Sequence, residues 1–149
     1  MMNTMNSNDQ TNNRQTLKIS ALLENLDEVT AFVESHLEDV GCPLKTLMQL
    51  NVAVEEIYVN IAHYAYQGTE VGDAVISLWL EDDPKAVVIE FRDSGMPFDP
   101  LAKDDPDVTL SAAERQIGGL GIYMVKKSMD DMQYQRENGE NILTIRKKL

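Results

Sequence analysis

The sequence predicts an α+β fold, a two-layer α/β sandwich in which helices pack on one face of a mixed, mostly antiparallel sheet. Two observations lead to this prediction. Two consecutive segments carry apolar residues at helical spacing, and two pairs of β-rich segments are each separated by a short turn. The chain has 149 residues, which is enough for one domain with a substantial core.

The first predicted strand is short and belongs at an edge of the sheet. Its apolar residues alternate with polar ones, at Leu17, Ile19 and Ala21. Asn25 followed by Glu28 predicts a capping box at the start of the first helix.

Two helices follow this strand. Apolar residues of the first helix recur at helical spacing, at Leu26, Val29, Val33 and Leu37. Gly41 closes this helix, Pro43 occupies the first turn of the second, and the second helix extends to about Tyr66. The second helix has an apolar stripe of its own, at Leu47, Leu50, Val54, Ile57, Ile61 and Ala65.

The β-rich segments form two predicted hairpins, with strands at residues 74–80, 86–92, 132–136 and 142–147. Asp82-Asp83-Pro84-Lys85 is typical of a turn and joins the first pair. Asn138-Gly139 joins the second pair and favours a two-residue hairpin turn.

A long loop and a third helix lie between the hairpins. Residues 97–117 hold three prolines and show no sustained periodicity before Ala112. A loop of this length inside a compact domain is usually functional or disordered, and we expect it to act as a lid. The third helix is predicted at about residues 119–129.

Composition limits the class of partner and the compartment. The net charge of −12 argues against nucleic acid or an anionic membrane as the main partner, because both require a basic face. Cys42 is the single cysteine, so no disulfide can form within the chain, and a reducing compartment fits. No apolar run approaches the ~18 residues of a membrane span. Residues 1–15 are polar and rich in Asn, which predicts a disordered arm before a single domain at 16–149 in a cytoplasmic protein.

One face of the second helix carries three polar residues. Glu56, Asn60 and His63 are spaced i, i+4, i+7, so they lie within about 60° of one another. This face is either solvated or lines a cleft. In a cleft, Asn60 could offer its carbonyl oxygen to magnesium and Glu56 could act as a base, while His63 would hydrogen-bond behind them. Glu55 points roughly 100° away and is expected to be a surface charge.

Asp93 and Gly95 follow a β-rich segment directly. An Asp-Ser-Gly sequence at a strand end is most often a turn, because Asp bonds its own backbone. In a nucleotide site, the Asp93 carboxylate would instead accept a hydrogen bond from the adenine amino group, and Gly95 would leave room for the ring.

The segment Gly118-Gly119-Leu120-Gly121 precedes the third helix. Free backbone N–H groups at a helix start bind phosphate. The Walker pattern fails because Lys126 stands where it requires glycine, and the dinucleotide pattern fails because Met124 stands where it requires glycine. Arg115 is either a surface charge or a lid residue that reaches a terminal phosphate.

Together these segments resemble the ATP-binding (Bergerat) fold of the GHKL superfamily, which includes gyrase, heat-shock chaperones, histidine kinases and mismatch-repair proteins. The stand-alone branch, the anti-sigma-factor serine/threonine kinases, is the most similar. Three motifs carry the resemblance: Glu56-Ile-Tyr-Val-Asn60-Ile-Ala-His63-Tyr-Ala-Tyr66, Asp93-Ser-Gly95 and Arg115-Gln-Ile-Gly118-Gly119-Leu-Gly121. It covers residues 17–149.

The resemblance implies ATP and Mg²⁺ as cofactors, with Glu56 as the catalytic base and Asn60 as the magnesium ligand. The further ATP contacts that it implies lie at His63, Asp93, Gly95, Pro97, Arg115, Gly118, Gly119 and Gly121. Two positions depart from the family pattern. Pro97 stands where most members have a second glycine, and Asn141-Ile142 stands where many carry a threonine near the adenine.

Four functions fit these motifs. The first is a serine/threonine kinase that phosphorylates a small anti-sigma-factor antagonist, binds a sigma factor and forms a homodimer, as in many relatives. The second is the ATP-binding half of a histidine kinase. His36 and His63 are the only histidines, and no paired-helix segment precedes the domain, which disfavours that function. The third is an ATP-driven clamp, for which no transducer domain follows Leu149. The fourth is an ATP-binding regulatory module without transfer.

Overall fold

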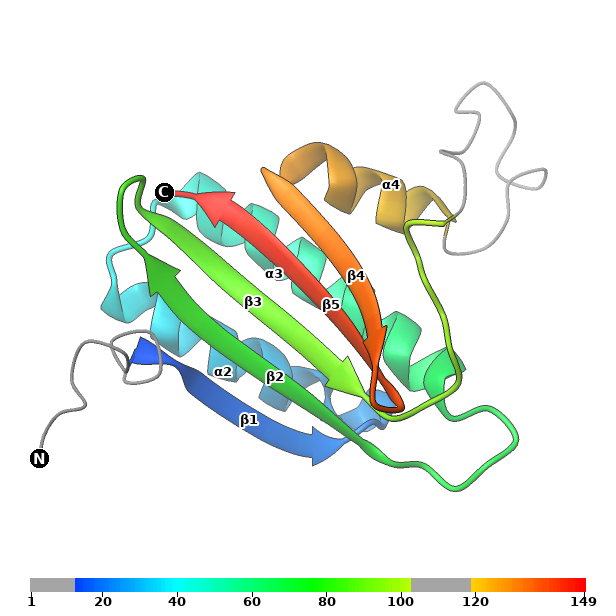
Figure 1. The fold of residues 1–149 in the computed structure, drawn as a ribbon. Helices are drawn as coiled ribbons and strands as arrows, with labels where there is room; N and C mark the ends of the chain where they lie inside the picture. The colour runs from blue at the N-terminus through cyan, green and yellow to red at the C-terminus, as the bar shows by residue number, and fades with distance from the viewer. Residues whose placement is uncertain (1–12, 103–118) are drawn as a thin grey trace, which may run out of the picture.

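The computed structural model describes residues 13–102 and 119–149. Within these residues, five strands form one antiparallel sheet, and helices form a second layer on one of its faces (Figure 1). The strands are β1 (Gln15–Ser20), β2 (Asp73–Glu81), β3 (Ala86–Asp93), β4 (Asp131–Glu137) and β5 (Glu140–Lys148). Their order is β1-β2-β3-β5-β4, and every pairing is antiparallel, where the sequence predicted a mixed, mostly antiparallel sheet.

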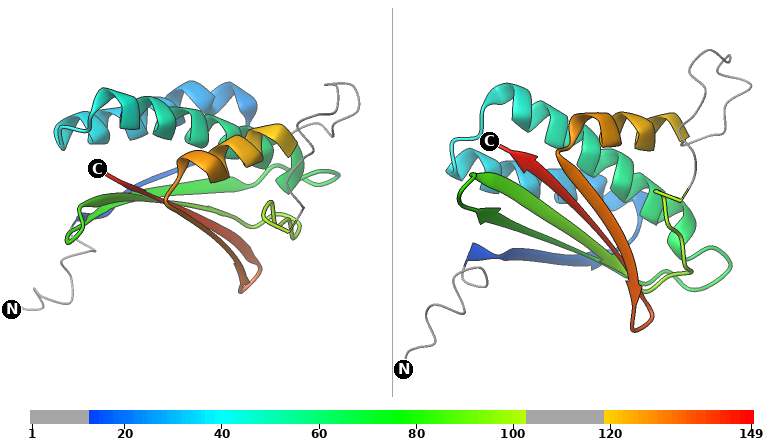
Figure 2. Two further views of the ribbon diagram at one scale, coloured as in Figure 1. Left: turned by 90° about the horizontal axis from the view of Figure 1, so that it is seen from above. Right: turned by 45° about the horizontal axis from the view of Figure 1, so that its top comes forward.

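The helical layer consists of α2 (Leu26–Asp39), α3 (Leu44–Asn60) and α4 (Gly119–Ser128), with a short 3₁₀ turn, η2 (Leu23–Asn25), before α2. α3 continues directly into a π-helical turn, η3 (Ile61–Ala65). Figure 2 shows α3 between α2 and α4 on the same face of the sheet. The second half of α3 and the start of α4 therefore face each other above the sheet.

The core lies between the two layers and follows the predicted apolar stripes. Its fully buried members include Val29, Val33, Leu37, Leu50, Val54, Val87, Ile89 and Phe91. Burying one such side chain stabilises the fold by about 1.5–3 kcal/mol relative to exposure. This core fixes α3 on β3, and so fixes the positions of the polar residues that both elements carry.

The two predicted hairpin turns are present. Asn138 and Gly139 both have positive φ, at 52° and 80°, as a type I′ turn between two strands requires. The β2–β3 turn contains Asp83 with φ 54°. In the β3–β5 ladder, which no hairpin joins, Asp93 lies opposite Asn141.

The predicted capping box at the start of α2 is wrong. Asn25 has φ −92° and ψ 5° and makes no capping bond, because the turn η2 runs directly into the helix. Its side-chain Nδ2 instead donates to the carbonyl oxygen of Ser20, at 2.9 Å. Pro43 lies one position earlier than predicted, with the extended ψ of 145° that precedes the first turn of α3. Gly41 closes α2 with φ 68°, as expected.

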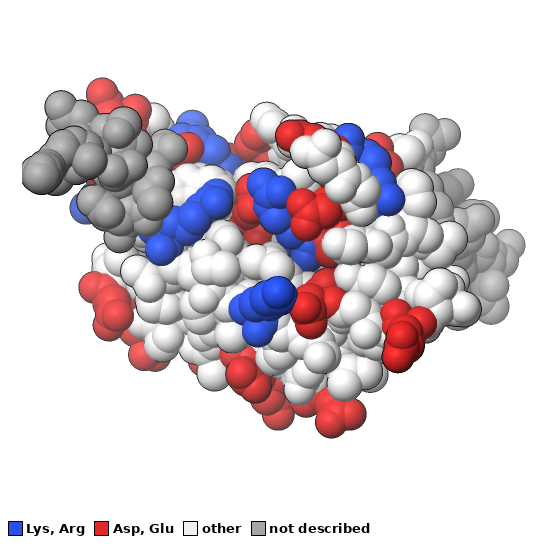
Figure 3. Space-filling view, turned by 60° about the horizontal axis from the view of Figure 1, so that its bottom comes forward, with Lys and Arg blue, Asp and Glu red and all other residues white. Residues whose placement is uncertain are grey.

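The face of the sheet opposite the helices carries ion pairs. Arg14 Nη2 lies 3.7 Å from Glu90 Oε2, and Arg92 Nε lies 2.7 Å from Glu90 Oε1. Figure 3, which views the molecule from the β1 side, shows Lys and Arg side chains next to Asp and Glu. Arg14 also lies 4.2 Å from the centre of the Trp79 ring, so residues 13–15 contact the sheet, although the sequence placed them in the arm.

Some predicted features lie outside the described residues. They are Arg115, Gly118, residues 1–12 of the predicted arm and most of the predicted lid at 97–117. Among the residues that are described, no helix has both the length and the apolar character needed to cross a membrane.

Candidate nucleotide-binding site

A cleft opens where the end of α3, the turn η3 and the start of α4 meet the carboxyl end of β3. It contains about 440 Å³ of space, including its open mouth. Most of its walls are apolar, and its polar lining residues are Asn60, Asp93, Tyr134 and Asn141. A mostly apolar cleft with a few placed polar groups is typical of a small-molecule site.

Asp93 provides a buried carboxylate at one end of the cleft. It is the last residue of β3, and it is only 6% exposed. Its Oδ1 accepts hydrogen bonds from the backbone N–H of Gly95 and from Asn141 Nδ2, both at 2.9 Å. Among the described residues, no donor contacts Oδ2. The second oxygen therefore remains available to accept a hydrogen bond from a ligand amino group.

Gly95 allows the chain after β3 to lie directly against η3. A Cβ atom at this position would collide with the carbonyl oxygen of Ala65. The same carbonyl accepts a hydrogen bond from Met96 N at 2.8 Å, and Arg136 Nη1 donates to Gly95 O at 2.8 Å. The glycine is thus required by a close backbone approach, and the wall beside Asp93 is held from two sides.

Asn141 and Tyr134 complete this end of the cleft. Asn141, on β5, is 6% exposed, and its side chain contacts Asp93 as well as the backbone after β3. Tyr134, on β4, donates its hydroxyl to Asn141 Oδ1 at 2.5 Å. Sequence analysis identified Asn141 only as part of Asn141-Ile142, a departure from a family pattern, and did not identify Tyr134. The alternation of Met132 and Tyr134 with polar neighbours was the one available indication that Tyr134 points inward.

Asn60 lies on the α3 side of the cleft, and Glu56 lies one turn before it on the same helix. Asn60 lines the cleft, and its Nδ2 lies 3.5 Å from Glu56 Oε2. The Glu56 carboxylate lies against Gly121 in the first turn of α4, where a Cβ atom would overlap it. Burial raises the pKa of Glu56, the hydrogen bond from Asn60 partly lowers it, and the charge of Glu55 adds a smaller increase. Glu55 itself is exposed, in agreement with its predicted surface position.

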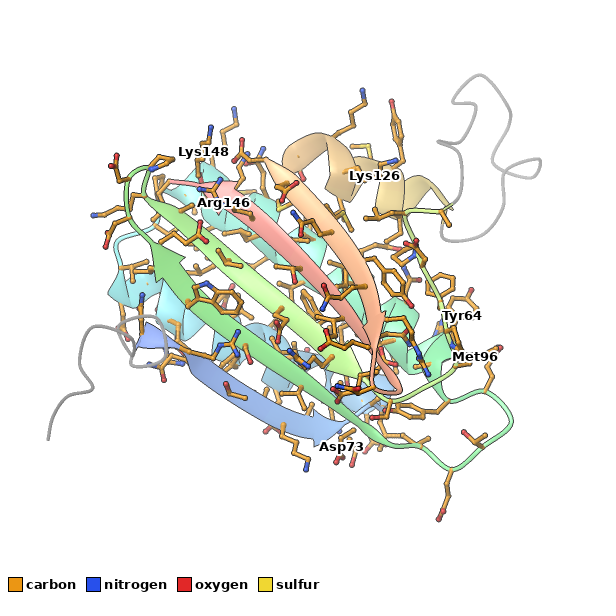
Figure 4. All side chains as sticks on the ribbon, in the orientation of Figure 1. Tyr64, Asp73, Met96, Lys126, Arg146 and Lys148 are labelled. Atoms are coloured by element: carbon orange, nitrogen blue, oxygen red, sulfur yellow. The ribbon has the colours of Figure 1, made fainter. Side chains whose placement is uncertain are left out.

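Two of the predicted contacts do not line the cleft. His63 and Pro97 are both exposed. His63 makes an edge contact with Tyr64, with ring centres 6.0 Å apart, and Tyr64 stacks on Phe98 at 5.9 Å. Figure 4 places Tyr64 beside Met96 at the end of the molecule where β3 ends. Gly119 is the first residue of α4, as the predicted phosphate-binding segment requires.

A family model described as a histidine kinase-like ATPase domain matches residues 19–147. The chain belongs to this family. The GHKL-type fold predicted from the three motifs is thereby confirmed.

Several relatives of this histidine kinase-like ATPase chain are protein kinases by name. It is 26% identical over 107 residues to the serine-protein kinase RsbW of Listeria monocytogenes, covering 69% of this chain and 67% of RsbW. It is 30% identical over 96 residues to the serine/threonine-protein kinase BtrW of Bordetella bronchiseptica, covering 64% of this chain and 66% of BtrW. The match to RsbW of Bacillus subtilis has 23% identity over 128 residues, covering 85% of this chain and 80% of RsbW. The predicted similarity to stand-alone serine/threonine kinases is confirmed.

A solved structure shares the fold of this ATPase domain. The SiaB–SiaC complex of Pseudomonas aeruginosa superposes with a TM-score of 0.59. The alignment covers 93% of each chain at 15% sequence identity. At this level of identity, the similarity bears on the fold alone.

The described residues fit a magnesium ion that is held largely by a nucleotide. Among residues 13–102 and 119–149, no group of three or more His, Cys, Asp or Glu side chains could form a metal site. Asn60 points its amide nitrogen at Glu56, which leaves its oxygen for another partner. One protein oxygen is sufficient where phosphates and waters supply the remaining ligands, as magnesium prefers.

Proposed function

We propose that this protein binds Mg·ATP in the cleft and transfers the γ-phosphate to a serine or threonine of a small anti-sigma-factor antagonist. One observation carries the proposal: a single cleft is lined both by the buried carboxylate of Asp93 and by Asn60, whose amide nitrogen contacts Glu56. The first group suits an adenine amine, and the second suits a metal-bound phosphate with an activated hydroxyl. The kinase relatives support the same reaction class.

The nucleotide would lie along the cleft with its base at the β3 end. Asp93 Oδ2 accepts a hydrogen bond from the adenine amino group, and the ring lies beside Gly95 among the apolar walls. The phosphates extend toward the first turn of α4, where Gly119 and Gly121 expose backbone N–H groups at the positive end of the helix dipole. Arg115, Gly118, His63 and Pro97 remain predicted contacts of the resemblance.

Transfer needs a base near the γ-phosphate. The acceptor hydroxyl oxygen forms a bond to the γ-phosphorus, and the bond from that phosphorus to the β–γ bridging oxygen breaks. ADP leaves with the electron pair, and the hydroxyl proton passes to Glu56. Asn60 would hold the magnesium ion, which when bound neutralises charge on the phosphates. Burial disfavours the ionised form of Glu56, which makes this carboxylate a stronger base than an exposed one.

The biological setting that we propose is partner switching. The unphosphorylated antagonist occupies the kinase, and its phosphorylation frees the kinase to hold a sigma factor. The similarity to serine-protein kinases supports this setting, and a homodimeric, cytoplasmic state belongs to the same proposal. Binding of Mg²⁺ and of a sigma factor belongs to the same proposal.

Incubation with γ-labelled ATP and each antagonist encoded by neighbouring genes tests the proposal. We expect label on a serine or threonine of one antagonist, stable to acid. Acid-labile label would instead indicate a phosphohistidine and favour the histidine kinase alternative. If nucleotide binds and no protein is labelled, the kinase activity is refuted and the regulatory ATP-binding module is favoured.

A further inference from the structure

Asn141 makes four hydrogen bonds with a single buried side chain. Its Nδ2 donates to Asp93 Oδ1 at 2.9 Å and to Met96 O at 2.8 Å. Its Oδ1 accepts from the Tyr134 hydroxyl at 2.5 Å and from Phe98 N at 3.3 Å. An asparagine amide offers two donors and one oxygen acceptor, so this side chain is fully used by the protein.

The partners of Asn141 allow only one orientation of its amide. Phe98 N can only donate, so it must face the amide oxygen. Met96 O can only accept, so it must face the amide nitrogen. The nitrogen is therefore always directed at Asp93, and the Tyr134 hydroxyl reinforces this choice from the opposite side.

This fixed donor has a consequence for Asp93. Gly95 N and Asn141 Nδ2 both donate to Oδ1, so the rotation of the carboxylate is fixed. Oδ2, to which none of the described residues donates, is the oxygen left for a ligand, and a carboxylate oxygen can accept a hydrogen bond but cannot donate one. The base site therefore favours a purine with an amino group at position 6 and disfavours one with a carbonyl there.

We propose that Asn141, oriented by Tyr134, is a positioning residue that sets the preference of this site for adenine over 6-oxo purines. The inference deepens the proposed function and rests on it. Asn141 acts through Asp93, because its own polar atoms are already paired within the protein. The same side chain holds the backbone at Met96 and Phe98, so the base site and the adjoining wall of the cleft form one unit.

Substitution Asn141→Asp tests this inference with little change in shape. It replaces the donor to Asp93 with a second carboxyl oxygen, and two carboxylates at that distance must share a proton. A proton held between the two carboxyl groups reduces the negative charge on Asp93 Oδ2, which weakens its acceptance from a 6-amine and its repulsion of a 6-carbonyl. We expect the ratio of ATP to inosine triphosphate affinities, measured by calorimetry, to fall by about tenfold or more.

Asn138→Asp is the matched control. It makes the same chemical change on the same hairpin at an exposed turn position, where aspartate also suits the turn. Its affinity ratio should equal that of the wild type. If Asn141 had a purely structural role, its substitution would lower the affinities for both nucleotides alike. An unchanged affinity ratio in Asn141→Asp would therefore overturn the inference.

Tyr134→Phe provides a second variant without a new charge. It removes one of the two donors to Asn141 Oδ1, and we expect the affinity ratio to fall by about fivefold. If Asn141→Asp fails to fold, as judged by thermal unfolding, this variant decides alone, and a wild-type ratio would then overturn the inference. Wild-type protein that binds neither nucleotide would refute the proposed function and this inference together. Wild-type protein that prefers ATP, with variants that keep the preference, would refute only this inference.

Discussion

The two ends of the cleft differ in how completely the protein pairs their polar atoms. At the base end, Asp93 Oδ1 and both polar atoms of Asn141 have protein partners at 2.5–3.3 Å. On the α3 side, where we propose that catalysis occurs, Glu56 and Asn60 share one long contact of 3.5 Å. The proposed base end is therefore built by the fold, whereas the α3 side has polar atoms without partners among the described residues, which a metal and phosphates would satisfy. On the proposed function, this difference would couple assembly of the catalytic groups to nucleotide binding.

The largest effect that we expect is on the rate of phosphate transfer, in a variant of Glu56. Glu56→Gln keeps the size of the side chain but removes the base, and general-base catalysis contributes about 10²–10⁴-fold in rate. We expect phosphate transfer to an antagonist to fall within that range, while ATP affinity stays within a few-fold because the base end is intact. The measurement is single-turnover transfer of γ-labelled phosphate.

Glu55→Gln is the matched control for this variant, because Glu55 is exposed on a neighbouring face of α3. It should transfer close to the wild-type rate, because the charge of Glu55 is the smallest of the three influences on the pKa of Glu56. Equal transfer by Glu56→Gln and the wild type would show that Glu56 is not the base, even if the protein is a kinase.

A smaller effect is expected on the affinity for ATP in the presence of magnesium. Asn60→Ala removes the protein oxygen that we assign to magnesium, and loss of an interaction with a charged group costs roughly tenfold to hundredfold in affinity. In calorimetric titrations, this variant should bind ATP with magnesium about as weakly as the wild type does without it. Asn51→Ala, on the α2-facing side of the same helix, should behave like the wild type. Equal affinities of wild type and Asn60→Ala, with and without magnesium, would remove Asn60 from the site.

The smallest effect concerns pH. Burial raises the pKa of Glu56, and Asn60 lowers it by a hydrogen bond. The transfer rate should rise with pH through the acidic range, with a midpoint above the usual range of a glutamate, and then level off. Asn60→Ala should move this midpoint upward. A midpoint that stays unchanged in Asn60→Ala would contradict the coupling between the two residues.

The same pKa shift affects stability in a defined direction. A carboxyl group whose pKa is raised in the folded state binds a proton more tightly there than in the unfolded chain. Its contribution to the free energy of unfolding is therefore full below the unfolded pKa and is lost as pH rises through the folded pKa. In thermal unfolding measured across this pH range, Glu56→Gln should lack the loss of stability that the wild type shows, since glutamine does not titrate.

Sequence reasoning located the parts of the site that depend on local geometry. Helical periodicity placed Glu56 and Asn60 together, and the residues after β3 placed Asp93 beside Gly95. The same periodicity failed for His63, because the π-helical turn η3 is wider than an α-helical turn. A rotation of 100° per residue no longer holds beyond Asn60, and the His63 side chain turns outward into solvent.

The base-end network could not be predicted for a different reason. Asn141 lies 48 residues after Asp93, and the two meet through the β3–β5 register. That register is set by core packing between strands that no short turn connects, so no local pattern encodes it. The position of Tyr134 relative to β5 follows from the β4–β5 hairpin, whose Asn138-Gly139 turn was predicted. Its position relative to Asp93 is known only when the register of β5 on β3 is known.

The central claim is that Asp93 reads the 6-amino group of ATP in a preformed site, and Asp93→Asn tests it most directly. Calorimetric titration would compare ATP with purine riboside triphosphate, which lacks that amino group, in the wild type and the variant. Loss of a charge-assisted hydrogen bond costs about 1.5–3 kcal/mol. We therefore expect the affinity of Asp93→Asn for ATP to fall by about tenfold to 150-fold, while its affinity for the analogue changes little. If both nucleotides weaken to the same extent, Asp93 acts only as a turn residue, and the claim is contradicted.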